Sequence, residues 1–251
     1  MNNVSAINPR DQWRALFLST FAFTVCFAVW TIFSIIGVQI KEDLGLNDTQ
    51  FGLLVATPVL TGSISRIFLG IWTEQFGGRI VFPLQMLVTA AAVWLLTSVQ
   101  TYEIFLLAAL GLGLAGGSFI VGIAYSSRWF EKERLGTALG IFGAGNVGAA
   151  VTNFAAPFLV VALGWEGTAR VYAIVLAVTA VLFYLLAKTD PVHEQRKRTA
   201  SGPVSVREQL APLKKMMVWR FATYYFFVFG GFVALASFLP RYYVGAYGLE
   251  L

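Results

Sequence analysis

Residues 135–160 read LGTALGIFGAGNVGAAVTNFAAPFLV, and none of these side chains carries a charge. A helix needs about 20 mostly apolar residues to cross the hydrocarbon core of a bilayer, so this stretch is long enough to span a membrane. The whole chain has the same character, because 57% of its residues are hydrophobic and 12% are charged. Soluble chains average about 25% charged residues. The sequence therefore predicts an integral membrane protein and excludes a disordered chain, whose composition is the opposite.

Six further apolar stretches lie along the chain. The predicted membrane spans are residues 16–40, 49–72, 80–99, 104–127, 135–160, 171–187 and 221–239. Short loops join the first six spans, so consecutive helices should be antiparallel neighbours. The predicted fold is an all-α membrane protein, in which a six-helix N-terminal bundle is followed by a seventh transmembrane helix.

Lys and Arg residues gather on one side of the predicted spans. That side holds most of the 18 basic residues, namely Arg10, Arg14, Arg79, Arg128, Lys132, Arg134, Lys188, Arg196, Lys197, Arg198, Arg207, Lys214, Lys215 and Arg220. The opposite side holds Lys41, Arg170 and Arg241. Cytoplasmic loops are enriched in Lys and Arg, so we expect a cytoplasmic N-terminus in a cytoplasmic (inner) membrane. The same bias accounts for the net charge of +5, and no nucleic-acid partner is expected.

The longest predicted loop divides the chain into three parts. We expect a six-helix unit at residues 1–187, a cytoplasmic linker at 188–220 and helix seven, the start of a second unit, at 221–251. His193, Glu194 and the basic residues after them are typical of a solvated linker. Residues 206–218 predict a short helix lying on the membrane surface.

Arg66 is the one charged residue inside a predicted span. An arginine at the centre of a bilayer costs about 2.5–3.5 kcal/mol on insertion scales, so a compensating interaction is expected. One interpretation is a side chain that snorkels to the nearby helix end. The other is an anion site, because the spans hold no carboxylate and guanidinium suits planar, bidentate oxyanions. The absence of Asp and Glu from the spans also disfavours a cation pathway in this part of the chain.

The sequence Gly143-Ala144-Gly145-Asn146-Val147-Gly148 matches the letters of the dinucleotide-binding pattern G-x-G-x-x-G. That pattern requires a preceding strand and a helix that begins at the glycines, whereas this one lies inside an apolar run. We therefore reject nucleotide binding. Two interpretations remain open: close helix packing through small residues, or packing combined with binding. In the second, Asn146 donates to an oxyanion while Gly143 and Gly145 make room and expose backbone.

Aromatic residues of the fourth and seventh spans are further candidates. Phe119 lies in a glycine-rich span and, taken singly, is better explained by packing or by contact with lipid than by contact with a ligand. Tyr225 and Phe229 are four residues apart and share a helix face. Tyr225 could donate a hydrogen bond and Phe229 could form the wall of a pocket, but a plain aromatic packing stripe explains the same spacing.

Residues 70–79, GIWTEQFGGR, join the second and third spans. They resemble the loop motif of the major facilitator superfamily: a glycine, three residues, an acid, a basic residue, any residue and a glycine before further basic residues. Gln75 and Gly78 replace basic residues of that motif, which weakens any gating role for the loop.

Within that superfamily, the chain resembles the nitrate/nitrite porter family. The features that carry this resemblance are the glycine motif at residues 143–148, the sequence Gly116-Gly117-Ser118-Phe119, Arg66 in helix two, and Tyr225 with Phe229 in helix seven.

The resemblance implies that the substrate is nitrate or nitrite. Arg66 would hold the anion, and Asn146 and Tyr225 would donate hydrogen bonds to it. Phe119 and Phe229 would stack on its flat faces. The family has twelve helices and a second substrate arginine in helix eight, so we expect the remaining second half to come from a longer chain or from another polypeptide. Transport would then be a rocking of two halves about a central site.

Other functions stay open on the residues alone. A seven-helix receptor or retinal protein is disfavoured because the N-terminus is predicted inside and no lysine lies in span seven. A facilitator for another small organic anion or a drug, and a membrane subunit without transport activity, remain alternatives. We expect no enzymatic activity, cofactor or metal, because the sequence shows no nucleophile–base set and no cluster of metal ligands.

Overall fold

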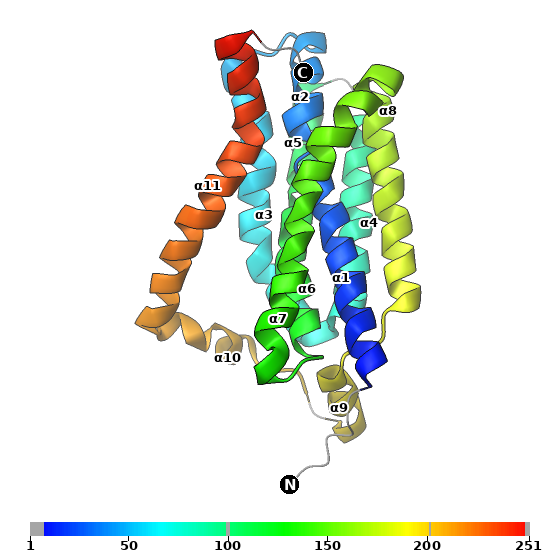
Figure 1. The fold of residues 1–251 in the computed structure, drawn as a ribbon, viewed down its shortest axis with the longest axis vertical. Coiled ribbons are helices and arrows are strands. Elements are labelled where there is room, and N and C mark those ends of the chain that lie inside the picture. Colours follow the sequence, from blue (N-terminus) through cyan, green and yellow to red (C-terminus); the bar gives the residue numbers. More distant parts are fainter. Residues whose placement is uncertain (1–7, 99–100, 201, 249–251) are drawn as a thin grey trace.

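The computed structural model describes residues 8–98, 101–200 and 202–248. These residues form a bundle of helices along one long axis, and the start of α1 lies at the opposite end from the end of α11 (Figure 1). In chain order the helices are α1 (Pro9–Trp30), α2 (Phe33–Asp43), α3 (Asp48–Phe76), α4 (Gly78–Leu96), α5 (Tyr102–Gly113), η1 (Leu114–Gly117), α6 (Ser118–Ser127), α7 (Lys132–Gly143), η2 (Ala144–Val147), α8 (Gly148–Leu186), α9 (Pro191–Thr199), α10 (Val206–Leu210), η3 (Ala211–Lys214) and α11 (Met216–Tyr247). The segments η1 to η3 are 3₁₀-helical. The predicted end of the third span, Val99, and the last residues of the seventh-helix unit, 249–251, lie outside the described residues.

Six stretches of the described chain are long and apolar enough to cross a membrane. One of them, Lys132–Leu186, contains 55 residues. A straight helix of that length would run about 80 Å, more than twice the bilayer core. The chain reverses at Gly164, whose φ of 69° is a conformation that glycine adopts readily. The six stretches are therefore enough for seven crossings, and Figure 1 shows the two limbs of α8 meeting at one end of the bundle and running apart towards the other.

The connection between the fifth and sixth spans is shorter than predicted. We expected a loop at residues 161–170, but backbone angles leave the helical region only at Gly164. The new limb is held by Trp165, whose Nε1 donates to Asp43 Oδ2 at 2.7 Å. One glycine in the left-handed region is therefore enough to turn the chain.

Three of the predicted spans contain short breaks in the α-helix. The first span breaks after Trp30, where Thr31 Oγ1 donates to the Phe27 carbonyl at 3.1 Å and competes with the helical hydrogen bonds. The fourth and fifth spans contain η1 and η2, in the sequences LAGG and AGNV. Hydrogen-bond geometry is poorer in a 3₁₀ turn than in an α-helix, so carbonyl groups there are more available to side chains from other helices.

Small residues allow α1 to lie close to η2 and α8. A Cβ on Gly148 would overlap the Thr24 carbonyl oxygen and lie 2.8 Å from the Ala28 nitrogen. Thr152 Oγ1 on α8 donates to the Ala28 carbonyl at 2.7 Å, within the same contact. Such small-residue contacts replace the hydrophobic driving force that is missing between helices in lipid.

The linker is more ordered than expected. The prediction that His193 lies in solvated linker is wrong, because this residue belongs to α9 and is only 7% exposed. The predicted surface helix at 206–218 is shorter in the structure, since α10 and η3 end at Lys214 and Met216 already begins α11. Figure 1 shows α9 and α10 together at the end of the bundle where α1 begins.

Candidate functional site

A cavity of about 610 Å³ lies between α3 and α11. Its polar lining residues are Ser63 and Arg66 on α3 and Tyr225 on α11, and the rest is mainly apolar. Trp30, at the end of α1, and Phe229 form part of the apolar wall. The cavity therefore brings together three of the residues predicted from the sequence: Arg66, Tyr225 and Phe229.

Arg66 is half-buried and reaches from α3 to η1. Its Nε donates to the Gly116 carbonyl oxygen at 3.2 Å, and its Cζ lies 5.3 Å from the centre of the Phe229 ring. The Tyr225 hydroxyl lies beside the guanidinium. Within the described ranges no carboxylate forms an ion pair with Arg66. The positive charge is thus held by a backbone dipole and an aromatic face, and it keeps donors available for an anion.

Phe119, Tyr225 and Phe229 form a stack of nearly parallel rings. The Phe119 ring centre lies 6.2 Å from that of Tyr225 and 6.2 Å from that of Phe229, with interplanar angles of 26° and 21°. The Tyr225 and Phe229 ring centres are 5.0 Å apart, with an interplanar angle of 15°. The three residues therefore form one aromatic cluster beside the guanidinium of Arg66.

Asn146 lies on η2 and faces a different cavity. This second cavity, of about 570 Å³, is lined by Asn146, Asn153 and neighbours on α8, and by Phe232 and Tyr243 on α11. It shares no lining residue with the Arg66 cavity. The Asn146 Nδ2 donates to the Gly143 carbonyl at 2.7 Å, and its buried Oδ1 has no partner among the described residues. An amide NH₂ group has two donors, so Asn146 keeps a second N–H while it donates to Gly143.

The two candidate glycines have different surroundings. A Cβ on Gly143 would meet nothing within 4 Å, so this residue borders open space. A Cβ on Gly145 would overlap the Phe23 ring and lie 3.2 Å from the Thr20 carbonyl oxygen, so Gly145 packs against α1. Gly145 lines neither of the two cavities described above.

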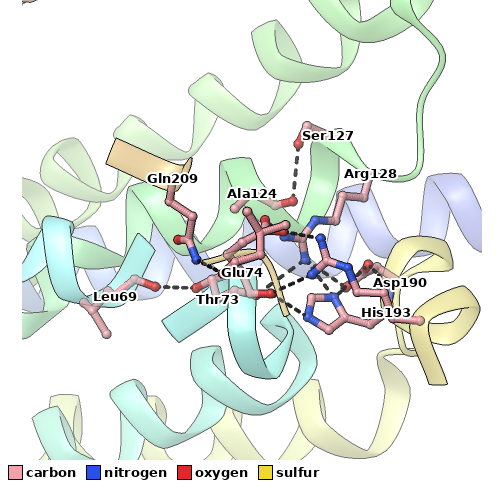
Figure 2. Close-up of polar contacts among 11 residues, drawn as sticks. Leu69, Thr73, Glu74, Ala124, Ser127, Arg128, Asp190, His193 and Gln209 are labelled. Atoms are coloured by element: carbon pink, nitrogen blue, oxygen red, sulfur yellow. Dashed lines mark hydrogen bonds and ion pairs between the residues drawn. The ribbon is translucent and has the colours of Figure 1, made fainter. Parts of the chain in front are cut away.

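A second polar cluster joins the end of α3 to α9 (Figure 2). Arg128, which follows α6, pairs through Nη2 with Glu74 Oε2 and through Nη1 with Asp190 Oδ2 at 3.3 Å. Arg196 on α9 pairs with Glu74 Oε1 at 2.6 Å and donates to the Glu74 carbonyl at 3.0 Å. The His193 ring bridges the same groups, with Nδ1 2.9 Å from Asp190 Oδ2 and Nε2 3.1 Å from the Glu74 carbonyl. This cluster fastens the linker to the bundle.

Asp190 is the most buried acid of this cluster, with 1% of its side chain exposed. Burial by itself raises the pKa of a carboxyl group. Hydrogen bonds from His193 and the positive charge of Arg128 outweigh burial, and the pKa of Asp190 is lowered from its ordinary value. The folded protein therefore favours the charged carboxylate.

One residue of this cluster carries a signal in the sequence. Glu74 stands at the acidic position of the loop motif, whereas Arg128, Asp190 and His193 lie in predicted loop or linker segments. Glu74 and His193 are 119 residues apart in the chain, and no spacing rule links them. The loop glycine has a structural reason, since Gly77 ends α3 with a φ of 87°.

The fold and the cavity define a multi-pass helical membrane protein with an arginine available inside the bundle. Residues 18–251 match the family described as the Major Facilitator Superfamily, and the chain belongs to that family.

Relatives with assigned names point to a narrower group. The chain is 41% identical over 254 residues to a probable nitrate/nitrite antiporter of Thermus thermophilus, which covers 96% of this chain and 56% of that protein. It is 34% identical to a nitrite extrusion protein of Bacillus subtilis, covering 95% of this chain and 59% of that protein. It is 31% identical to a probable nitrate transporter of Staphylococcus epidermidis, covering 97% and 61%. The chain thus spans less than two thirds of the length of these relatives.

Proposed function

We propose that this chain forms the N-terminal part of a transporter that carries nitrate, nitrite or both across the membrane. The observation that carries the proposal is Arg66, a guanidinium inside the bundle that faces a cavity and pairs with no carboxylate of the described chain. The names of the relatives agree with an inorganic oxyanion as substrate.

The contacts of Arg66 favour one way of holding the anion. Its Nε is engaged by the Gly116 carbonyl, so the end-on pair Nη1 and Nη2 supplies the two parallel donors for two oxygens of nitrate or nitrite. Tyr225 supplies a further hydroxyl donor from the opposite helix. Phe119 and Phe229 cover the flat faces of the ion.

Asn146, Gly143 and Gly145 belong to the same proposal with distinct roles. Asn146 donates its second amide N–H to the anion when movement of the two halves brings η2 towards the Arg66 cavity. Gly143 leaves open space where a side chain would stand. Gly145 keeps η2 close to α1 and so acts through packing.

The transport cycle requires a second half. Residues 1–187 form the first six-helix half, residues 188–220 the cytoplasmic linker, and residues 221–251 the start of the second half, which the rest of a longer chain or another polypeptide completes. The two halves rock about the anion site by alternating access. We place the N-terminus in the cytoplasm and the protein in a bacterial inner membrane, on the distribution of Lys and Arg.

The test compares nitrate uptake by the complete transporter with Arg66→Lys and Arg66→Ala in proteoliposomes. Lysine keeps the charge but loses the planar fork. We expect both variants to lose nitrate uptake by about 100-fold, as befits a charge-assisted bidentate contact. Arg170→Ala is the matched control, since Arg170 is exposed and, among the described residues, contacts Glu166 and Thr97 near the Gly164 turn. Normal uptake by Arg66→Ala in correctly inserted protein would overturn the nitrate assignment.

A second candidate function follows from the size of the cavity. About 610 Å³ is within the range of drug-sized ligand sites and far exceeds the volume of nitrate. The second candidate is therefore a facilitator for a larger organic anion, with Arg66 binding its carboxylate. Inhibition of nitrate uptake by benzoate, compared with neutral benzamide, separates the two. Transport of labelled benzoate without nitrate uptake would establish the second candidate.

A further inference from the structure

We propose that Trp30 is a positioning residue, which holds α3 and η1 at the separation that lets Arg66 present its end-on fork to the anion. This inference rests on the proposed role of Arg66 as the anion-binding residue. Trp30 ends α1, is 6% exposed and forms part of the wall of the Arg66 cavity.

The first contact of Trp30 is with α3. Its indole Nε1 donates to the Pro58 carbonyl oxygen at 3.1 Å. Pro58 lies inside α3, where its missing N–H and its ring weaken the helical hydrogen-bond ladder. The indole therefore anchors the part of α3 that lies two turns before Arg66.

The second contact is with η1. A Cβ on Gly116 would lie 2.8 Å from the Trp30 Cε2 and 2.9 Å from its Nε1, so the indole lies directly against the Gly116 backbone. A Cβ on Gly62 of α3 would lie 3.2 Å from the same Nε1 and 2.9 Å from the Gly113 carbonyl. Because Gly62 and Gly116 have no side chain, the indole fits at the junction between α3 and η1.

These contacts act on the group that orients Arg66. The Gly116 carbonyl accepts from Arg66 Nε at 3.2 Å, near the long end of normal N–H···O distances. A small shift of η1 away from α3 removes this hydrogen bond and leaves the guanidinium free to rotate. The charge then stays in the cavity, but the fork that matches two oxygens of the anion is no longer held in place.

The experiment measures nitrate transport kinetics of the complete transporter carrying Trp30→Phe. Phenylalanine keeps an aromatic ring but loses the Nε1 donor and part of the ring that fills the junction. We expect the KM for nitrate to rise about tenfold while the maximal rate changes less than about twofold, because the binding orientation is lost and the transport machinery is intact.

Trp165→Phe is the matched control. Trp165 is 7% exposed, and its Nε1 also donates to a single acceptor, Asp43 on α2. It lies at the Gly164 turn, away from Arg66, so its replacement should lower thermal stability without raising the KM. If Trp30→Phe behaves like Trp165→Phe, with lower stability and an unchanged KM, Trp30 is a packing residue and the inference fails.

Gly116→Ala changes the η1 side of the same junction. It provides a second test if Trp30→Phe inserts poorly into the membrane. Its methyl group would crowd the indole, so we expect a similar rise in KM with an unchanged maximal rate. The Arg66 variants distinguish failure of the proposed function from failure of the positioning role of Trp30. If Arg66→Ala leaves nitrate KM unchanged, the proposed function fails; if Arg66→Ala abolishes uptake but Trp30→Phe and Gly116→Ala leave KM unchanged, only the positioning role fails.

Discussion

Two arginines of this protein are withdrawn from water in different ways. Arg128, at the end of the bundle, is 10% exposed and pairs with the carboxylates of Glu74 and Asp190. Arg66, in the middle of α3, has the Gly116 carbonyl, the Phe229 ring and the Tyr225 hydroxyl around it, and no carboxylate pairs with it in the part of the chain described. The charge of Arg128 is neutralised by two carboxylates of the chain, whereas the charge of Arg66 is not neutralised by any carboxylate of the described residues.

The presence or absence of a carboxylate partner indicates whether a buried arginine has a structural role or a binding role. Breaking a buried ion pair costs several kcal/mol because the remaining charge is left uncompensated, so Arg128 with its carboxylates acts as a structural fastener. A guanidinium that contacts a carbonyl group and an aromatic ring receives less electrostatic stabilisation than one paired with carboxylates. In the proposed function a bound anion supplies the remaining compensation, so that binding of the anion offsets the cost of removing the charge from water.

We expect the largest effect from a substitution that gives Arg66 a carboxylate partner, as Arg128 already has. Ser63 lies three residues before Arg66 on α3 and lines the same cavity, so Ser63→Asp places an acid within reach. We expect nitrate uptake to fall by about 100-fold, because the new carboxylate occupies the guanidinium and repels the substrate. The measurement is nitrate uptake in proteoliposomes, with membrane insertion checked separately.

Ser63→Asn is the matched control, because it has the same shape without the charge. It should retain uptake within about threefold. Equal losses in Ser63→Asp and Ser63→Asn would mean that the cavity tolerates no bulk at Ser63, and that charge compensation of Arg66 is not the cause.

The reverse change removes a carboxylate from Arg128. Asp190→Asn keeps the side-chain shape and leaves Glu74 as the acidic partner of Arg128 among the described residues. We expect the free energy of unfolding to fall by about 2 kcal/mol, less than for a fully broken buried pair because Glu74 remains. The KM for nitrate should change less than about twofold. Thermal unfolding of the purified protein in detergent measures the first effect.

Glu194→Gln is the control on the same helix. Glu194 pairs with Arg198 at the surface, where the two side chains are 54% and 72% exposed, and such pairs contribute little. Its melting temperature should match that of the native protein. A native-like melting temperature for Asp190→Asn would show that the cluster does not stabilise the fold.

The smallest expected effect is a dependence on pH. The pKa of Asp190 is lower in the folded protein than its ordinary value, so its carboxylate stabilises the fold above about pH 4. That contribution is lost as the pH falls below 4 and through the lowered pKa. We expect the difference in melting temperature between native protein and Asp190→Asn to be constant from pH 7 to 5 and to shrink towards pH 3. A difference that is independent of pH over this range would contradict the assignment of the charge to Asp190.

The sequence predicted those features that depend on composition within one segment. The membrane spans and the position of Arg66 follow from apolar length and from a lone charge inside it. Tyr225 and Phe229 follow from their spacing on one helix, and the structure places both in the Arg66 cavity. Local patterns of this kind are visible because the membrane forces each helix to satisfy its own backbone.

The remaining features depend on contacts between distant segments. The 3₁₀ segments η1 and η2 contain Gly116 and Gly145, which pack against α1, and periodicity does not reveal this contact. His193 looked solvated because its neighbours are basic, yet its ring packs beside Gly77 and reaches the Glu74 carbonyl. The placement of Asn146 in a separate cavity likewise depends on where α11 lies, and no motif specifies that.

The attachment of α9 also sets the length of a tether. With Arg196 and His193 bound at the end of α3, only residues 200–215 connect the anchored linker to α11. Fully extended, they reach at most about 55 Å, and the helical turns of α10 and η3 shorten that span. Release of α9 would add its residues to the tether and lower the effective concentration of α11 at the bundle. The ion pairs of Glu74 therefore limit how far α11, which follows Lys215, can move from the end of α3.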